Sequence, residues 1–248
     1  MKISIITATY NSASTLEATI LSVINQSFEN IEYIIIDGKS DDGTLQIIDK
    51  YKNSITKFVS EKDNGIYDAL NKGINLATGD VIGILHSDDF YIHNDVLKNI
   101  AKEFVSTGCN ALYANLYYVD RLNTNKIIRK WKAGTFTPES FLYGWMPPHP
   151  TFFVKKEIYN QYGVFNPEFK TSADYELMLR LLCRHKIKTS YLNEYIVKMR
   201  MGGQSNVSTK NRIAANLEDR KAWQVNELKP YFFTLFFKPL RKLGQFIP

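Results

Sequence analysis

The sequence predicts an α/β fold built on a mostly parallel, doubly wound sheet. Through the first 90 residues, short apolar runs of strand length alternate with segments whose apolar residues recur at helical spacing. Continuous apolar runs such as residues 33–36 are typical of strands buried on both faces of a parallel sheet. A helical extension is expected at the C-terminal end, where a long polar segment follows.

The expected elements of the first half follow one another in βαβαβαβ order. Strands are expected at residues 3–6, 33–36, 55–59 and 81–85, and helices at residues 16–24, 45–51 and 66–76. This order favours right-handed crossovers between parallel strands. Asn11 or Ser12 is expected to cap the first helix, and Ser14 with Glu17 has the spacing of a capping box.

The second half of the chain is less regular. Strands are expected at residues 112–119 and 126–131, followed by a proline-rich loop at residues 144–150. Helices are expected at residues 173–185 and 208–228. The tail, residues 230–248, is rich in aromatic and basic side chains. It is expected either to lie in a membrane interface or to pack back on protein.

Composition excludes several classes of protein. The chain has 248 residues, of which 44% are hydrophobic, too many for a disordered chain. Its formal net charge of +6 suits an anionic partner without choosing one. No apolar run approaches the roughly 20 residues that cross a bilayer. With no recognisable signal peptide, and with Cys109 and Cys183 expected to be reduced and buried, a cytoplasmic location is expected, including the inner face of the membrane.

Polar residues follow four successive strands of the predicted sheet. In chain order they are Thr7, Thr9 and Asn11; Asp37 and Gly38; Glu61 and Asp63; and His86, Ser87, Asp88 and Asp89. Ligands bind at this carboxyl edge of open α/β sheets, although Asp and Gly are also common in plain turns. The adjacent carboxylates of Asp88 and Asp89 repel each other unless a cation offsets their charge. Oxygen ligands of this kind suit Mg²⁺ or Mn²⁺.

Five stretches in this part of the chain match one family in the same order. They are SIITATYN at residues 4–11, IDGKSDDGT at 36–44, EKDNGIYDALNKG at 61–73, ATGD at 77–80 and LHSDD at 85–89, and a weaker match continues to about residue 206. On these residues the chain resembles the family 2 glycosyltransferases, which have the GT-A fold. The resemblance implies an inverting enzyme of bacterial polysaccharide type. Such an enzyme transfers a sugar from a nucleotide diphosphate donor, most commonly a UDP-sugar, to a hydroxyl of a glycan or lipid-linked acceptor.

The resemblance also divides the chain and assigns residues. It implies a glycosyltransferase domain over residues 1–206, with the nucleotide-sugar half at 1–110 and the acceptor and catalytic half at 111–206, followed by an extension at 207–248. Asp37 is expected to accept a hydrogen bond from the base. Asp89, with Asp88, is expected to hold Mn²⁺ or Mg²⁺ on the diphosphate. The expected donor-binding residues are Thr7, Thr9, Asn11, Asp37, Gly38, Asp68, Lys72, Ser87, Asp88 and His149.

Asp174 is the expected catalytic base. It lies in the first turn of the helix expected at residues 173–185, where the helix dipole alone also favours an Asp. The stretch resembles the family's catalytic segment, in which the Asp before an aromatic residue takes the proton of the acceptor hydroxyl. Ala173 stands where many relatives have an acidic residue. Glu176, two positions further on, is expected to face away from the site.

Several assignments stay open between a functional and a structural interpretation. His149 is either a contact to the diphosphate or acceptor or a loop histidine. Residues 202–206 are either a segment near the donor phosphates or a plain loop. Lys72 and Arg200 either reach phosphate or are solvated surface charges. Three aromatic side chains either stack on an acceptor sugar or pack in the core; they are Trp131, Tyr143 and Trp145.

Three other functions compete with this interpretation. A nucleotidyltransferase would normally carry a Gly-rich phosphate loop after the first strand, and residues 7–11 contain no glycine. A catalytically silent nucleotide-binding module is expected to have lost Asp89 or Asp174, and both are present. A nucleic-acid binder is not expected, because the basic residues are dispersed. The expected partners are the nucleotide sugar, its acceptor and a membrane surface at residues 230–248, with a homo-oligomer left open.

Overall fold

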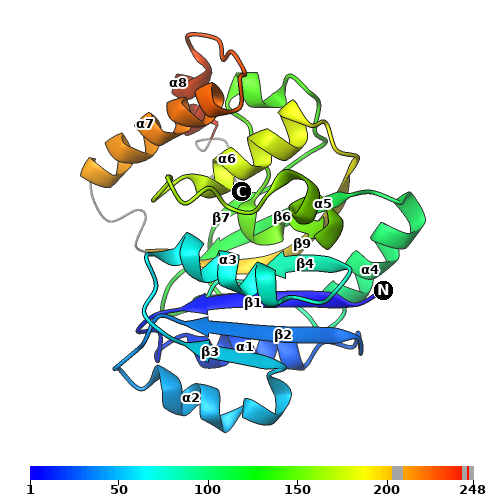
Figure 1. The fold of residues 1–248 in the computed structure, drawn as a ribbon, viewed down its shortest axis with the longest axis vertical. Helices are drawn as coiled ribbons and strands as arrows, with labels where there is room; N and C mark the ends of the chain where they lie inside the picture. Colours follow the sequence, from blue (N-terminus) through cyan, green and yellow to red (C-terminus); the bar gives the residue numbers. More distant parts are fainter. Residues whose placement is uncertain (203–208, 242–244, 246–248) are drawn as a thin grey trace.

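The computed structural model describes residues 1–202, 209–241 and 245, and in this part of the chain nine strands form one curved sheet (Figure 1). The strand order is β3-β2-β1-β4-β8-β6-β9-β5, with β7 paired to β6. The strands are β1 (Ile3–Thr9), β2 (Ile31–Asp37), β3 (Lys57–Ser60), β4 (Val81–Ile84), β5 (Asp89–Tyr91), β6 (Ala111–Val119), β7 (Ile127–Trp131), β8 (Phe153–Lys155) and β9 (Thr189–Arg200). The helices are α1 (Leu16–Ile24), α2 (Thr44–Lys50), η1 (Lys52–Ser54), α3 (Ile66–Leu76), α4 (Val96–Thr107), η2 (Ser140–Tyr143), η3 (His149–Thr151), α5 (Lys156–Tyr162), α6 (Ala173–Leu179), η4 (Arg180–Arg184), α7 (Thr209–Val225) and α8 (Thr234–Leu240).

The N-terminal half has the predicted arrangement. β1 pairs in parallel with both β2 and β4, and β2 pairs in parallel with β3. Every residue of β1 is buried. Ile6 and Ala8 pack with residues of α3, while Ile3 and Ile5 pack with residues of α1 and α4. Burial on both faces explains why the strand sequences are continuously apolar, and the predicted α/β fold class is confirmed.

The second half departs from the predicted elements. β8 runs antiparallel to both β4 and β6, and β9 pairs in parallel with β6. The sequence patterns did not predict α4, α5, β5, β8 or β9. Val96, Ile100 and Phe104 of α4 recur at helical spacing on its buried face, a signal that could have revealed this helix. β9 is half-exposed and its register is irregular, so its sequence lacks the simple alternation of a strand.

The start of α1 also differs from the prediction. Among the described residues no side chain caps this helix, and the backbone carbonyl of Ser12 accepts its first N–H groups. The side-chain oxygen of Asn11 accepts the N–H of Asp41 over 3.0 Å. Glu17, the expected capping-box partner, forms an ion pair with Lys50 at 2.6 Å. The predicted caps are therefore wrong, because Asn11 binds the loop after β2 and Glu17 pairs with a residue of α2.

The predictions for the helix at residues 173–185 and for the two cysteines are met in part. The helix expected at residues 173–185 is α-helical only to Leu179 and continues as the π-helical turn η4. Cys109 is buried and Cys183 is half-buried, and both are free thiols. The predicted burial is thus met by Cys109 and only in part by Cys183, which packs at the edge of the core. None of the helices described here is long and apolar enough to cross a membrane.

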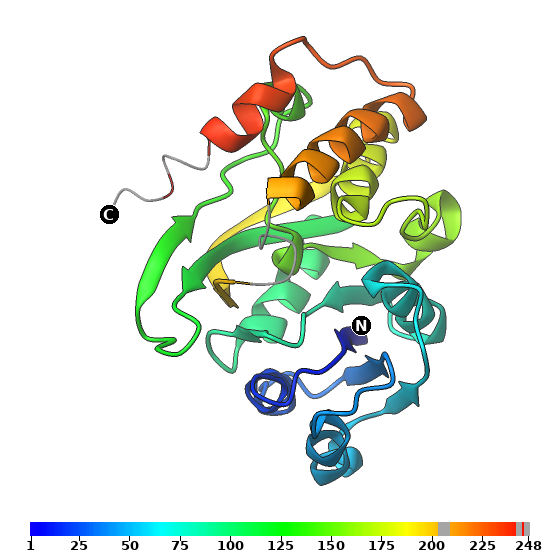
Figure 2. The ribbon, with the colours of Figure 1, turned by 90° about the vertical axis from the view of Figure 1, so that its left-hand side faces the viewer.

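The C-terminal extension packs against the rest of the protein. α7 lies alongside α6 (Figure 2), where the indole of Trp223 donates to the hydroxyl of Tyr175 over 3.0 Å. The carboxylate of Glu218 accepts hydrogen bonds of 2.8 to 3.0 Å from the backbone N–H groups of residues 170–172. Burial alone would raise the pKa of Glu218, but these bonds outweigh it and lower the pKa below its ordinary value. One carboxylate of the extension thus holds the loop that precedes α6.

Replacing Glu218 by alanine is expected to lower the free energy of unfolding by about 2–3 kcal/mol at pH 7, since hydrogen bonds to a charged group contribute about 1.5–3 kcal/mol. Because the folded pKa of Glu218 is lowered, its stabilisation is complete above the unfolded value, near 4.5, and declines as the pH falls below it. The difference in free energy of unfolding between Glu218→Ala and the wild type should therefore become smaller at acidic pH. Urea unfolding over a range of pH measures it.

Glu227→Ala is the control, since Glu227 forms an exposed ion pair with Arg184 and such pairs contribute at most about 1 kcal/mol. Amide hydrogen exchange at residues 170–172 should accelerate in Glu218→Ala and not in Glu227→Ala. Equal exchange in the two variants would show that Glu218 does not hold this loop.

Candidate active site

The carboxyl ends of the N-terminal strands meet along one edge of the sheet. Thr9, Asp37 and Ser60 are neighbours in the register of β1, β2 and β3, and the turn at residues 86–89 follows the adjacent strand β4. Thr9 is buried, and its hydroxyl finds no hydrogen-bond partner within the described residues. Because a buried polar group without a partner is costly, Thr9 is suited to contact a ligand at this edge.

Two of the predicted donor residues are engaged inside the protein. Asp37 is buried and accepts hydrogen bonds from the side chains of Ser40 and Ser60 and from two backbone N–H groups. Oδ2 accepts three of these bonds and Oδ1 accepts one, so Oδ1 keeps the capacity for a further donor. Thr7 is fully buried, and its hydroxyl donates to the backbone carbonyl of Leu85 over 2.8 Å. Thr7 therefore lies in the core and outside the candidate site.

The loops that follow β1, β2 and β4 are tied together at this edge. Asn11 is exposed in the loop after β1. The hydroxyls of Ser12 and Ser87 lie 2.9 Å apart and join the first loop to the turn after β4. The N–H of Gly38 donates to the carbonyl of Thr9 over 2.8 Å. The structure thus gathers Asn11, Gly38 and Ser87 around the same edge as Thr9.

Lys72 is surrounded by carboxylates. Its ammonium lies 2.6 Å from Asp63, 2.7 Å from Glu61 and 3.4 Å from Asp68. Hydrogen bonds to Asp63 and Glu61 raise the pKa of Lys72. The backbone N–H of Asn64, and the charge of Lys72, lower the pKa of Asp68. The single charge of Lys72 thus offsets part of the charge of three carboxylates, and Lys72 is an ion-paired side chain and not an isolated solvated charge.

The carboxylate of Asp89 is fully buried. In the described part of the chain neither of its oxygens has a hydrogen-bond partner. Burial, and then the nearby charge of Asp88, raise the pKa of Asp89. Such a carboxylate is unfavourable unless a cation or strong donors compensate it. Asp88 and Asp89 therefore fit a divalent cation that takes its other oxygens from water and phosphate, the usual mode of Mg²⁺. No group of three or more His, Cys, Asp or Glu side chains that could hold a metal occurs among the described residues.

Arg200 supports the turn that bears these two acids. Its Nη1 donates to the backbone carbonyl of Asp88 over 2.6 Å, and its guanidinium lies over the ring of Phe90 at 4.8 Å. The side chain is buried, and burial lowers the pKa of the guanidinium. The interpretation of Arg200 as a solvated charge is wrong. Arg200 ends β9, which lies between β5 and β6 and pairs with both, an arrangement that the sequence did not predict.

Asp174 is brought to the same edge by contacts with two other elements. The hydroxyl of Tyr67 on α3 donates to its Oδ1 over 3.3 Å, and Nδ1 of His149 on η3 lies 3.4 Å from its Oδ2. The rings of His149 and His86 are 5.5 Å apart, edge to face, and His86 begins the turn that continues to Asp89. Burial, and then His149, lower the pKa of His86 to about 4. His149 thus bridges Asp174 and the turn and is not a plain loop histidine.

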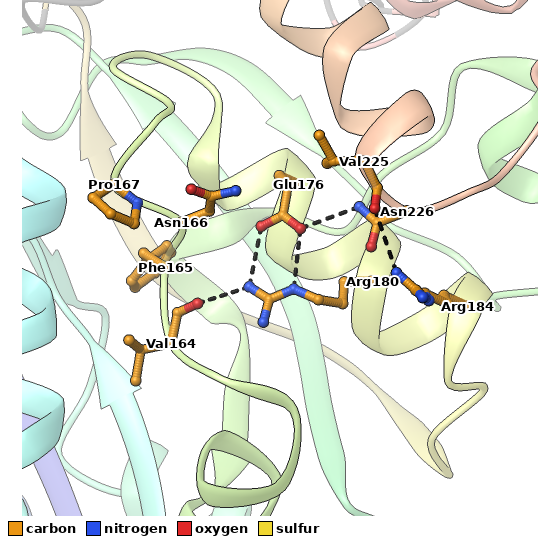
Figure 3. A pocket seen from close by; sticks show the side chains of 9 residues that line it. All are labelled: Val164, Phe165, Asn166, Pro167, Glu176, Arg180, Arg184, Val225 and Asn226. Atoms are coloured by element: carbon orange, nitrogen blue, oxygen red, sulfur yellow. Dashed lines mark hydrogen bonds and ion pairs between the residues drawn. The ribbon is translucent and has the colours of Figure 1, made fainter.

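Glu176 faces away from Asp174, as expected. Figure 3 shows its carboxylate against the guanidinium of Arg180, 3.0 Å away, and against the side-chain amide of Asn226. Arg180 also donates to the carbonyl of Val164 over 2.7 Å. A cavity of about 350 Å³ lies beside these residues. Because the polar groups named here bind one another, this network fastens α6 to the end of α7.

The three aromatic candidates for an acceptor platform have different surroundings. Trp145 is buried, and its indole donates to a backbone carbonyl over 2.7 Å, so it belongs to the core. Trp131 stacks against Tyr118 at 6.2 Å. Tyr143 is exposed and lies against Tyr231 of the C-terminal segment. Of the segment 202–206, for which the sequence left open a place near the donor phosphates or a plain loop, residues 203–206 lie outside the described residues.

Two residues of this arrangement were missed by the sequence analysis. Tyr67 adjoins Asp68 within the matched stretch 61–73, which could have drawn attention to it. No spacing pattern connects Glu218 with the loop at residues 170–172, because that contact depends on how α7 packs.

The chain is similar in sequence to known glycosyltransferases. The family model described as Glycosyl transferase family 2 matches residues 4–167. A PGL/p-HBAD biosynthesis glycosyltransferase of Mycobacterium bovis is 28% identical over 207 residues, which are 82% of this chain and 78% of that protein. WfaP of Escherichia coli, a UDP-Glc:alpha-D-GlcNAc-diphosphoundecaprenol beta-1,3-glucosyltransferase, is 31% identical over 188 residues, 73% of this chain and 70% of that protein.

Solved structures share the fold. S. aureus TarS 1-349 in complex with UDP-GlcNAc has a TM-score of 0.68 at 20% identity and covers 91% of this chain, which spans 65% of that chain. This chain spans only 41% of a longer TarS chain. The mannosyltransferase PcManGT from Pyrobaculum calidifontis, in complex with GDP-Man and Mn²⁺, has a TM-score of 0.67 at 16% identity and covers 96% of this chain and 68% of its own. With the match over residues 4–167 and the strand-end geometry together, this chain belongs to the family 2 glycosyltransferases and is a glycosyltransferase of the GT-A fold.

Proposed function

We propose that this enzyme inverts configuration while transferring a sugar from a UDP-sugar to a hydroxyl of a glycan or lipid-linked acceptor, in the biosynthesis of a surface polysaccharide. One observation carries the proposal: two contacts connect Asp174 with the turn that bears Asp88 and Asp89. His149 contacts Asp174, and its ring packs against that of His86, which begins this turn. The relatives support the substrate classes. WfaP is named for UDP-Glc and a diphosphoundecaprenol-linked sugar, and one TarS structure holds UDP-GlcNAc.

The proposed chemistry uses Asp174 as the base. A sugar hydroxyl is a weak nucleophile at neutral pH, so a positioned base must accept its proton as the new bond forms. Tyr67 and His149 each contact one oxygen of the Asp174 carboxylate and orient it. The acceptor oxygen bonds to the anomeric carbon as the bond to the nucleoside diphosphate breaks. Attack from the face opposite the leaving group inverts that carbon.

The proposed donor pocket lies at the carboxyl edge of β1, β2 and β4. Its members are Thr9, Asn11, Asp37, Gly38, Ser87 and Asp88, and His149 and Lys72 lie at its border. Asp89, with Asp88, would hold Mn²⁺ or Mg²⁺, because its buried oxygens lack partners among the described residues. A bound cation would offset the charge that develops on the departing diphosphate.

Asp174→Asn is expected to reduce transfer by about 10²- to 10⁴-fold, the usual contribution of a general base, while keeping donor binding. Asp89→Ala is expected to lose the Mn²⁺-dependent part of donor binding. Thermal stabilisation by UDP-Glc or UDP-GlcNAc with Mn²⁺, and again with a chelator, measures binding. UDP release in the presence of acceptor measures transfer.

Asp49→Asn is the matched control, because Asp49 is exposed on α2 and pairs only with Lys52 in the contacts described. Wild-type transfer by Asp174→Asn would refute the base assignment. Metal-dependent binding without transfer by the wild type, across donors and acceptors, would favour a silent nucleotide-binding protein. Pyrophosphate release from a nucleoside triphosphate would favour a nucleotidyltransferase.

The C-terminal segment supports a lipid-linked acceptor. α8 packs back on the core: Leu235 is buried, and the hydroxyl of Thr234 donates to the carbonyl of Leu142 over 2.7 Å. Large aromatic side chains remain exposed in α8 and in the turn before it, with Phe236 at 68% and Phe232 at 90%. Exposed aromatic side chains beside basic residues are typical of segments that lie in a membrane interface. We therefore include contact of these side chains with the membrane in the proposed function.

Replacing Phe232 and Phe236 together by serine is expected to weaken binding to lipid vesicles by about 10-fold or more, since burying one Phe side chain contributes about 1.5–3 kcal/mol. Cosedimentation with vesicles of phosphatidylglycerol and phosphatidylcholine measures the effect. The control replaces Val105 and Leu122, which are equally exposed but lie on α4 and in the turn after β6. Equal loss in both double variants, or no binding by the wild type, would contradict membrane contact through α8.

A further inference from the structure

A second cavity lies at the start of α3 and is lined in part by Tyr67, whose hydroxyl contacts Asp174. Its volume is about 370 Å³, and ligand pockets usually measure about 300–1,000 Å³. One wall is the start of α3 with the residues just before it, 64–68, and the other is the loop at residues 167–170. The cavity therefore lies between the N-terminal half of the chain and the loop that leads into α6.

The walls of this cavity are held in place from both sides. The side-chain amide of Asn71 on α3 exchanges two hydrogen bonds, of 2.9 and 3.0 Å, with the backbone of Phe165. Lys221 of α7 forms an ion pair with Glu168 at 2.8 Å. Glu218 binds the backbone N–H groups of the residues that follow. The cavity is thus formed before any ligand enters, which reduces the entropy cost of binding.

The lining of the cavity is partly apolar and partly polar. Ile66, Tyr67 and Phe169 supply apolar and aromatic surface, and Ile66 is 45% exposed. The polar side chains on its wall are those of Asn64, Asp68 and Lys170. An apolar surface with a few amide and charged groups matches a pyranose, which has C–H faces and a rim of hydroxyls. A single ammonium beside a carboxylate is poorly suited to a diphosphate.

Tyr67 connects the cavity to the proposed base. Its side chain lines the cavity, and its hydroxyl donates to Oδ1 of Asp174. The other oxygen, Oδ2, is contacted by His149, which leads to His86 and the turn of Asp88 and Asp89. The two oxygens of Asp174 therefore face different neighbours, the cavity residue on one side and the proposed donor pocket on the other. Inversion requires the acceptor and the leaving group to lie on opposite sides of the anomeric carbon.

We propose that this cavity is the subsite for the acceptor sugar. It takes a neutral pyranose, whose attacking hydroxyl reaches Asp174 past the phenol of Tyr67. The inference rests on the proposed function, because it needs Asp174 to act as the base. It also moves Asp68 from the donor pocket to the wall of the acceptor subsite, in agreement with its position in the cavity lining.

Ile66→Trp tests the proposal, because an indole at this half-exposed position fills the cavity. Octyl glycosides of common hexoses serve as acceptor probes, with UDP-Glc and UDP-GlcNAc as donors. We expect the KM for the octyl glycoside to rise by about 10-fold or more, since steric clash opposes binding. Leu76→Trp is the matched control, because Leu76 is similarly exposed at the opposite end of α3. An unchanged acceptor KM in Ile66→Trp would overturn the proposal.

If none of the octyl glycosides is an acceptor in the transfer reaction, a binding measurement tests the proposed subsite. Isoleucine methyl NMR spectra of the wild type, with UDP and the diamagnetic ion Mg²⁺ present, are recorded while each octyl glycoside is added. A shift of the Ile66 signal, assigned through Ile66→Val, supports the subsite, and no shift with any probe overturns it. Failure of the proposed function is distinguishable, because it would appear as the absence of thermal stabilisation by UDP-sugars in the wild type.

Discussion

The position of one carboxylate, that of Asp174, depends on groups from both halves of the chain. Tyr67 comes from a helix of the N-terminal half and His149 from a short helical turn of the second half, and each contacts a different oxygen. Both distances exceed 3.2 Å, which leaves room for these contacts to tighten when a substrate binds. The relative placement of the two halves therefore sets the direction in which the proposed base can accept a proton.

The burial of Asp89, the first residue of β5, is a second constraint on the structure. The carboxylate of Asp89 is buried next to Asp88, and none of the described residues donates a hydrogen bond to it. The hydrogen bonds that hold this turn are made to its backbone: Arg200 binds the carbonyl of Asp88, and Thr19 donates to the carbonyl of Asp89 over 2.7 Å. The charge of Arg200 offsets only part of the effect of burial on the Asp89 carboxylate. A turn held by its backbone leaves the acidic side chains available to a cation, at the expense of folding stability.

The C-terminal extension is part of this arrangement. Glu218 holds the loop before α6, and Trp223 binds Tyr175, the neighbour of the proposed base. The same extension continues into α8, whose outer face is aromatic and exposed. Contact of α8 with a membrane would therefore act close to the elements that position Asp174 and line the proposed acceptor subsite, which suits an acceptor carried on a lipid.

The sequence by itself determined the N-terminal sheet, because strands buried on both faces must be continuously apolar, and it located the strand ends where Asp37, Asp88 and Asp89 lie. It could not decide which side chains at those ends are available to a ligand. Thr7 and Asp37 are engaged by Leu85, Ser40 and Ser60, partners that only the assembled sheet brings near.

The tertiary structure alone decided the surroundings of the proposed base and the burial of Arg200. Tyr67, His149 and Glu218 are far from Asp174 in the chain, and no periodic pattern encodes contacts over such separations. Arg200 is buried because β9 pairs with β5 and β6. Local patterns record which face of an element is buried, whereas the contacts that orient a side chain depend on how the elements pack.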